Sequence, residues 1–209
     1  MAGWAKKAYE ETDYALLGDT YGFSIYHMGL EAFGYQKYFT MMAGEPGLVH
    51  VWMTAIIDQS ENFFDTYLDA VGPYIVAVIM GDDYGTQRAP MISVKMFREL
   101  FKPYLARICK FIHGKNPYVK VLLHSCGAVK PFIPEFIDAG VDALNPVQTT
   151  AVSPGGITVS AAACTSIPAS PSRAYSGGTT PSRHTSTYTL ISFCLRGLIG
   201  IRPVFPERR

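Results

Sequence analysis

The most specific chemical feature of this 209-residue sequence is a histidine and a cysteine separated by one residue, His124 and Cys126. They follow an apolar run, and on an extended backbone residues two apart project to the same side, with Cα atoms about 6 to 7 Å apart. An imidazole nitrogen and a thiolate sulfur at that spacing could share one Zn²⁺, at bond lengths of about 2.0 to 2.3 Å. A catalytic zinc site also needs a third protein ligand, so the pair predicts part of a metal site. The alternative is a buried histidine and cysteine that bind no metal.

Further polar side chains follow two other apolar runs. Asp82, Asp83 and Gln87 lie in one loop, and Asn145 and Gln148 lie after a later run. We expect one aspartate to hold a polar ligand or to support the metal ligands, with its pKa raised by the neighbouring like charge. A solvated or turn-capping pair is the alternative, and hydrogen bonding within the loop is the alternative for the two amides. We predict these five residues to be substrate-binding.

The elements that would position these residues alternate between helical and extended patterns. In chain order, the patterns predict a helix over 46–71, a strand over 74–80, a helix over 93–112 kinked at Pro103, a strand over 119–124, a helix over 129–137 and a strand over 141–145. Alternation of this kind needs parallel pairing with right-handed crossovers. No Gly-x-Gly-x-x-Gly motif follows any predicted strand, and the polar residues stand at the carboxyl ends, where a (β/α)₈ barrel carries its active site.

The overall composition excludes several classes of protein. The formal net charge is +1, so no basic field supports binding to a nucleic acid. The longest uncharged apolar run of the patterned region, 74–80, is far shorter than a membrane helix needs, and Lys6 and Lys7 lead into acidic residues rather than a secretory signal. The four cysteines include no Cys-x-x-Cys spacing and predict no disulfide framework. We therefore expect a cytoplasmic protein without nucleic-acid or membrane partners.

The composition changes near residue 151. Residues 151–209 hold six arginines and one glutamate but no lysine or aspartate, and they are rich in serine and threonine. Only a short run from Tyr188 to Ile201 shows apolar patterning there. We predict a domain over 1–151 and a low-complexity Ser/Thr/Pro/Arg tail over 152–209, either disordered or a non-native, out-of-frame translation. Reading the encoding nucleotides in the other frames tests the second interpretation.

Three linked motifs resemble the uroporphyrinogen decarboxylase superfamily. They are residues 81–87, residues 97–104, and residues 123–127 continuing into 139–148, and the similarity extends over about residues 12–151. The resemblance implies an α/β fold, here an incomplete TIM (β/α)₈ barrel, because a full barrel takes about 250 residues.

The resemblance is greatest to the corrinoid-dependent methyltransferase branch. In that branch a His-x-Cys pair and a distant third cysteine bind zinc, which activates a small thiol that takes a methyl group from a methyl-corrinoid. His124 and Cys126 match the first two ligands, whereas the similarity stops before the third. The implied partners are a corrinoid protein or a tetrapyrrole ligand. The alternatives are a uroporphyrinogen decarboxylase of porphyrin biosynthesis, and a non-catalytic tetrapyrrole-binding or inactive fragment. With this incomplete barrel we expect poor solubility or inactivity of the chain on its own.

Overall fold

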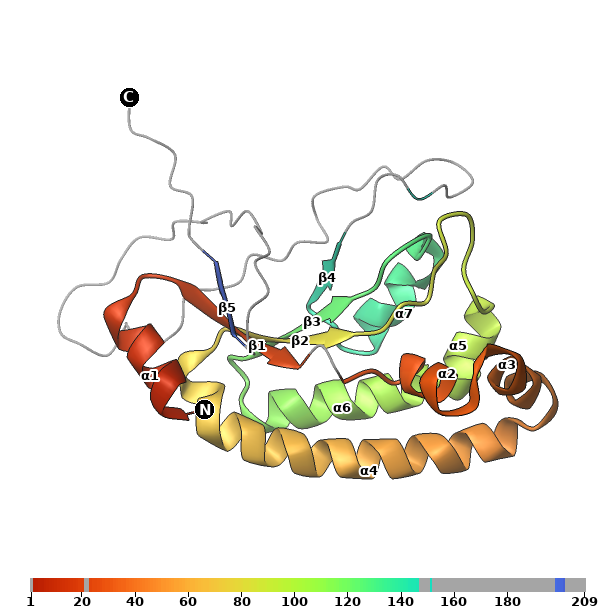
Figure 1. Ribbon diagram of the computed structural model, residues 1–209, viewed down its shortest axis with the longest axis horizontal. Coiled ribbons are helices and arrows are strands. Elements are labelled where there is room, and N and C mark those ends of the chain that lie inside the picture. Colours follow the sequence, from red (N-terminus) through yellow and green to blue (C-terminus); the bar gives the residue numbers. More distant parts are fainter. Residues whose placement is uncertain (1, 21–22, 147–150, 152–197, 202–209) are drawn as a thin grey trace.

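The computed structural model describes residues 2–20, 23–146, 151 and 198–201, and its centre is one β-sheet (Figure 1). The strands are β1 (Ala15–Thr20), β2 (Ala77–Gly81), β3 (Lys120–His124), β4 (Ala143–Asn145) and β5 (Leu198–Ile201), in the spatial order β4-β3-β2-β1-β5. β1 to β4 pair in parallel, and β5 pairs antiparallel with β1. The carboxyl ends of β1 to β4 therefore meet at one edge of the sheet.

Helices connect the parallel strands. They are α1 (Ala2–Glu11), α2 (His27–Phe33), α3 (Tyr35–Gly44), α4 (Pro46–Val71), α5 (Val94–Leu100), α6 (Lys102–Lys115) and α7 (Ile133–Asp138), with 3-10 turns at Gly72–Tyr74 and Lys130–Phe132. The long helices α4 and α6 run side by side along one face of the sheet (Figure 1). Strand, helix and parallel strand follow one another, so the structure confirms the predicted α/β class and is consistent with a partial TIM barrel.

The structure corrects several predicted boundaries. The helix predicted over 129–137 is a 3-10 turn followed by α7, and the strand predicted over 141–145 is β4, which begins at Ala143. Two further corrections have a clear cause. The strand predicted over 74–80 is β2, which begins only at Ala77, because Gly72–Tyr74 form a 3-10 turn. The kinked helix predicted over 93–112 is two helices separated at Phe101 (φ −124°), with Pro103 in the first turn of α6. Proline suits a first turn, where its missing N–H costs no hydrogen bond, but it cannot continue the preceding helix. Ser93 caps α5, since its hydroxyl accepts the Met96 N–H at 3.1 Å.

The two faces of the sheet bury different sets of side chains. Val78, Met80, Val121 and Leu123 belong to the large core shared with the helices. The opposite face carries a smaller buried cluster of Leu17, Ala77, Ile79 and Leu122. Because side chains alternate along a strand, His124 of β3 lies on the same face as Leu122. The candidate site therefore lies at the carboxyl edge of this second, apolar face.

The predicted tail over 152–209 is represented by β5 alone; its other residues lie outside the described residues. β5 falls at the end of the run 188–201, the one stretch of the tail with apolar patterning. It runs antiparallel to β1, whereas the strands of a (β/α)₈ barrel all run parallel.

Of the helices that the structure describes, none combines the length and the apolar character that crossing a membrane requires.

Candidate metal centre

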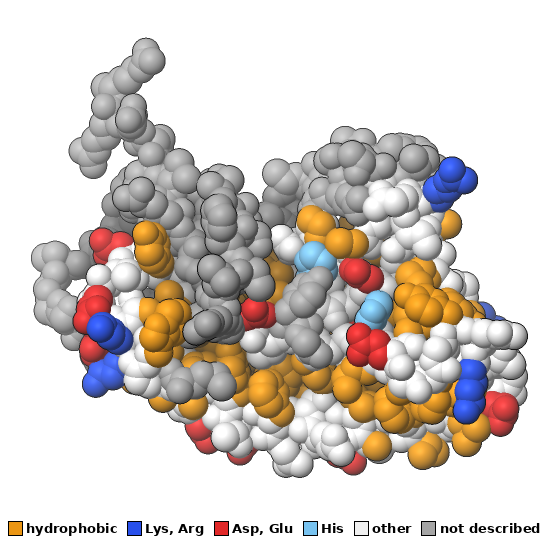
Figure 2. All heavy atoms as spheres, viewed as in Figure 1, with side chains coloured by type: hydrophobic (Ala, Val, Ile, Leu, Met, Phe, Trp, Pro, Cys, Tyr) orange, Lys and Arg blue, Asp and Glu red, His pale blue; other side chains and the backbone are white. Residues whose placement is uncertain are grey.

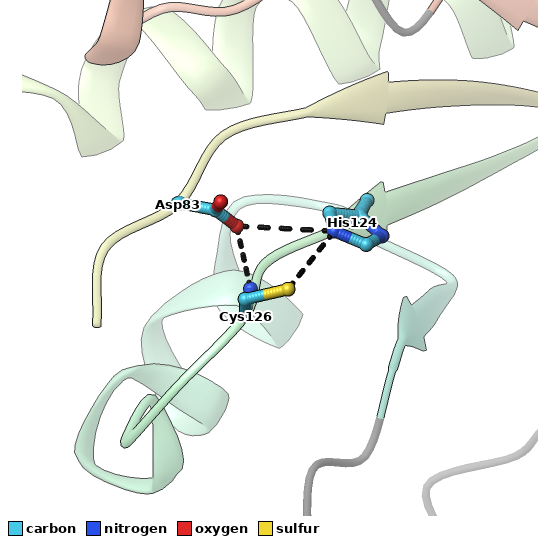
Figure 3. Close-up of side chains that lie close together, drawn as sticks. All are labelled: Asp83, His124 and Cys126. Atoms are coloured by element: carbon cyan, nitrogen blue, oxygen red, sulfur yellow. Dashed lines mark hydrogen bonds and ion pairs between the residues drawn. The ribbon is translucent and has the colours of Figure 1, made fainter. Parts of the chain in front are cut away.

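Three side chains of types that can ligate a metal converge at the carboxyl edge of the sheet (Figure 3). His124 ends β3, Cys126 lies two residues later, and Asp83 comes from the loop after β2. The distance from His124 Nε2 to Cys126 Sγ is 3.2 Å, and that from Nε2 to Asp83 Oδ1 is 3.9 Å. One ligand atom from each residue lies within 4.8 Å of the other two. Figure 2 shows histidine and acidic side chains together on the face viewed, near the ends of these strands.

Two glycines allow the loops after β2 and β3 to cross closely enough for this convergence. Gly127 has φ +81°, and a Cβ there would lie 2.6 Å from the backbone of Gly85. A Cβ on Gly85 would in turn lie 2.7 Å from Ala128 N. With no side chains between them, Ala128 N–H donates to Thr86 O at 2.8 Å. The crossing holds Asp83 beside Cys126, whose backbone N–H donates to Asp83 Oδ1 at 2.6 Å.

Asn145 orients the imidazole. Its Oδ1 lies 2.9 Å from His124 Nδ1, and β4 and β3 pair with Asn145 directly opposite His124. An amide oxygen only accepts, so Nδ1 carries the proton and the Nε2 lone pair faces Cys126 and Asp83. Metal-binding histidines usually donate their second nitrogen in this way.

Burial raises the pKa of the Cys126 thiol, and the adjacent Asp83 carboxylate raises it further. The thiol therefore stays protonated when no cation is bound, and its S–H can donate to His124 Nε2. A cation between the three groups would favour the thiolate, because its charge offsets that of the carboxylate.

Asp82 faces the opposite way from Asp83. Its carboxylate is 4% exposed and accepts the backbone N–H groups of Ile25, Tyr26 and His27 at 2.9 to 3.1 Å, together with the Tyr84 hydroxyl at 2.5 Å. Burial raises the pKa of Asp82, and these hydrogen bonds act against that rise. Its contacts make it an anchor between the loop after β2 and the start of α2. A substrate-binding role for Asp82 stays a prediction.

The structure brings together four of the predicted residues, namely Asp83, Asn145, His124 and Cys126. Gln87 lies exposed in the loop after β2, and Gln148 falls outside the described residues.

Sequence reasoning missed Ser125, which is fully buried and accepts the Tyr84 N–H at 3.2 Å, joining the same two loops. The one sequence feature that could have pointed to Ser125 is its position between His124 and Cys126.

Comparison with protein-family models gives a match to uroporphyrinogen decarboxylase (URO-D) over residues 23–154. No curated protein and no solved structure is found to be similar. The matched span covers more than half of the chain and includes Asp83, His124, Cys126 and Asn145. With parallel strands, helical crossovers and polar residues at the carboxyl edge, the chain belongs to the uroporphyrinogen decarboxylase family.

Proposed function

We propose that the chain is part of a zinc-dependent enzyme that transfers a methyl group from a methyl-corrinoid to a small thiol. The observation that carries the proposal is the 3.2 Å separation of His124 Nε2 from Cys126 Sγ at the carboxyl edge of a parallel sheet. The match to the URO-D model supports membership of that family, but it does not distinguish methyl transfer from decarboxylation.

The residues fit the metal that this function requires. Imidazole and thiolate are ligands that zinc prefers, and the lone pair of Nε2 faces the sulfur because Asn145 holds the proton on Nδ1. His124 and Cys126 would hold the ion. When bound, zinc would lower the pKa of a coordinated thiol and so favour the nucleophilic thiolate.

The surrounding chain contributes orientation and apolar surroundings. Asn145 fixes the imidazole, and the Gly85–Gly127 crossing fixes the loop that carries Cys126. On the same face of the sheet lie the buried side chains of Leu17, Ile79 and Leu122. Buried apolar side chains next to these ligands would limit access of water to a thiolate.

Zinc analysis of purified protein tests the proposal. We expect about one equivalent of zinc in the wild type and in Cys109→Ala, a control that removes a buried cysteine of α6 outside the site. Cys126→Ala should lose most of the zinc. Equal metal content in Cys126→Ala and the wild type would overturn the methyltransferase proposal.

A second candidate function is decarboxylation of a porphyrinogen, the activity after which the matched family is named. A protein stripped of metal by a chelator distinguishes the two. Release of carbon dioxide from a porphyrinogen by the metal-free protein would support the decarboxylase, whereas thiol methylation that is restored by zinc would support the methyltransferase.

A further inference from the structure

We propose that Asp83 is the third protein ligand of the metal site, supplying oxygen beside the nitrogen of His124 and the sulfur of Cys126. The inference rests on the proposed function, because it concerns the metal that this function requires. It adds to that proposal the identity of the ligand that sequence reasoning could not supply.

The separations of the donor atoms support a shared ion. Zinc bond lengths of about 2.0 to 2.3 Å at tetrahedral angles place ligand atoms about 3.4 to 3.6 Å apart. In the structure, Nε2 lies 3.2 Å from Cys126 Sγ and 3.9 Å from Asp83 Oδ1. Movements of a few tenths of an ångström would bring both separations to those values. Among the described residues this is the one group of three or more potential metal ligands whose ligating atoms all lie within 4.8 Å of one another.

The chain holds the Asp83 carboxylate in place before any ion binds. The Cys126 N–H donates to Oδ1 at 2.6 Å, and the Gly85–Gly127 crossing fixes the two loops relative to each other. A carboxylate has about four lone-pair positions, so this hydrogen bond leaves others for a cation. Figure 3 shows Asp83 directed toward both the imidazole and the cysteine.

The charges of the three ligands also match a divalent cation. One thiolate and one carboxylate carry two negative charges, and neutral His124 adds none. The complex with Zn²⁺ is therefore neutral, which limits the cost of holding it in a partly buried site. Asparagine at position 83 would leave a net positive charge and a weaker ligand.

The test measures binding of Zn²⁺ and Co²⁺ alone by wild type, Asp83→Asn, Asp83→Cys and Cys126→Ala, with Asp138→Asn as a matched control. Asparagine keeps an oxygen that can accept the Cys126 N–H, so the loop crossing is retained. Asp138 is 70% exposed on α7, and its substitution removes the same charge outside the site. Affinities come from competition with a chromogenic chelator, and visible absorption of the Co²⁺ forms reports the ligand set.

We expect Asp83→Asn to weaken zinc binding by more than about 100-fold and to change the Co²⁺ spectrum. Asp83→Cys should restore binding and add intensity to the sulfur-to-cobalt charge-transfer band. Asp138→Asn should match the wild type. An unchanged spectrum in Asp83→Asn, whatever its affinity, would overturn ligation by Asp83.

The panel separates failure of this inference from failure of the proposed function. If Cys126→Ala loses the metal while Asp83→Asn keeps it with the wild-type spectrum, the site stands and Asp83 is not a ligand. If the wild type binds neither ion, or Cys126→Ala binds as the wild type does, both fail. Circular dichroism of each variant, compared with wild type, establishes that loss of metal is not loss of fold.

Discussion

At the scale of single residues, His124 offers its two ring nitrogens to different partners. Nδ1 is bound to Asn145 at 2.9 Å, and Nε2 faces Cys126 and Asp83. The amide of Asn145 therefore decides which nitrogen carries the proton and which lone pair a cation can reach. A ligand of this kind depends on a residue that never touches the metal.

We predict that Asn145→Leu, which is close in volume but cannot accept a hydrogen bond, weakens zinc binding by about 10- to 100-fold. The reason is that His124 loses the partner that fixes its tautomer and ring orientation. Competition with a chelator measures the change. An affinity within twofold of the wild type would show that the imidazole needs no such support.

The sequence predicted that His124 and Cys126 lie close together, because residues two apart on an extended backbone project to the same side. It could not separate the roles of Asp82 and Asp83, which are chemically identical neighbours. Their difference comes from backbone N–H groups more than fifty residues earlier in the chain, which surround Asp82, and from the Cys126 N–H, which binds Asp83. Long-range partners of that kind leave no local pattern.

At the scale of elements, the accuracy of prediction followed the strength of the local pattern. α4 begins at Pro46 and ends before Gly72, as its apolar period and stop signals predicted. β1 was missed because it contains Gly18 and Asp19, which strands disfavour. Gly18 is closely packed, since a Cβ there would lie 2.6 Å from the hydroxyl of Tyr67 and would force that side chain to shift. Only the folded arrangement reveals that contact.

Asp142, just before β4, joins three parts of the fold. Its carboxylate binds His113 Nε2 of α6 at 2.8 Å, Lys120 Nζ of β3 at 3.1 Å and the Val121 N–H at 2.9 Å. Burial by itself would raise its pKa, but these partners together hold the pKa at about 2.

This lowered pKa predicts a pH-dependent contribution to stability. The unfolded chain protonates Asp142 at a pKa of about 3.9, above the folded value, so the contribution is complete above about pH 4 and is lost as the pH falls toward 2. Asp142→Asn should lower the free energy of unfolding by about 2 kcal/mol at pH 7, with the difference shrinking between about pH 4 and pH 2. Urea unfolding at several pH values measures it. A difference that stays constant down to pH 2.5 would contradict the assignment.

At the scale of the whole molecule, the helices cover one face of the sheet and β5 covers its β1 edge (Figure 1). The change in composition near residue 151 predicted a domain boundary, but it did not predict that four residues of the tail add a strand to the sheet. This strand pairs with a segment about 180 residues earlier through backbone hydrogen bonds, and amino-acid composition carries no information about such pairing.

Two proline substitutions test this pairing. Ile199 lies opposite Leu17 and Gly200 opposite Leu16, and in an antiparallel ladder consecutive residues direct their N–H groups to opposite sides. We therefore expect one of Ile199→Pro and Gly200→Pro to speed hydrogen exchange of β1 amides, while the other serves as its control. Wild-type exchange rates in both variants would show that β5 does not pair with β1.

The opposite orientations of Asp82 and Asp83 have a consequence for how this family can vary. Successive residues of an extended segment project to alternate sides, so inserting or deleting one residue before Asp82 would exchange the two positions. The interior anchor would then face the open rim, and the rim carboxylate would enter the core. The length of this loop must therefore be preserved together with the two aspartates, and we expect homologues to lack insertions and deletions before Asp82.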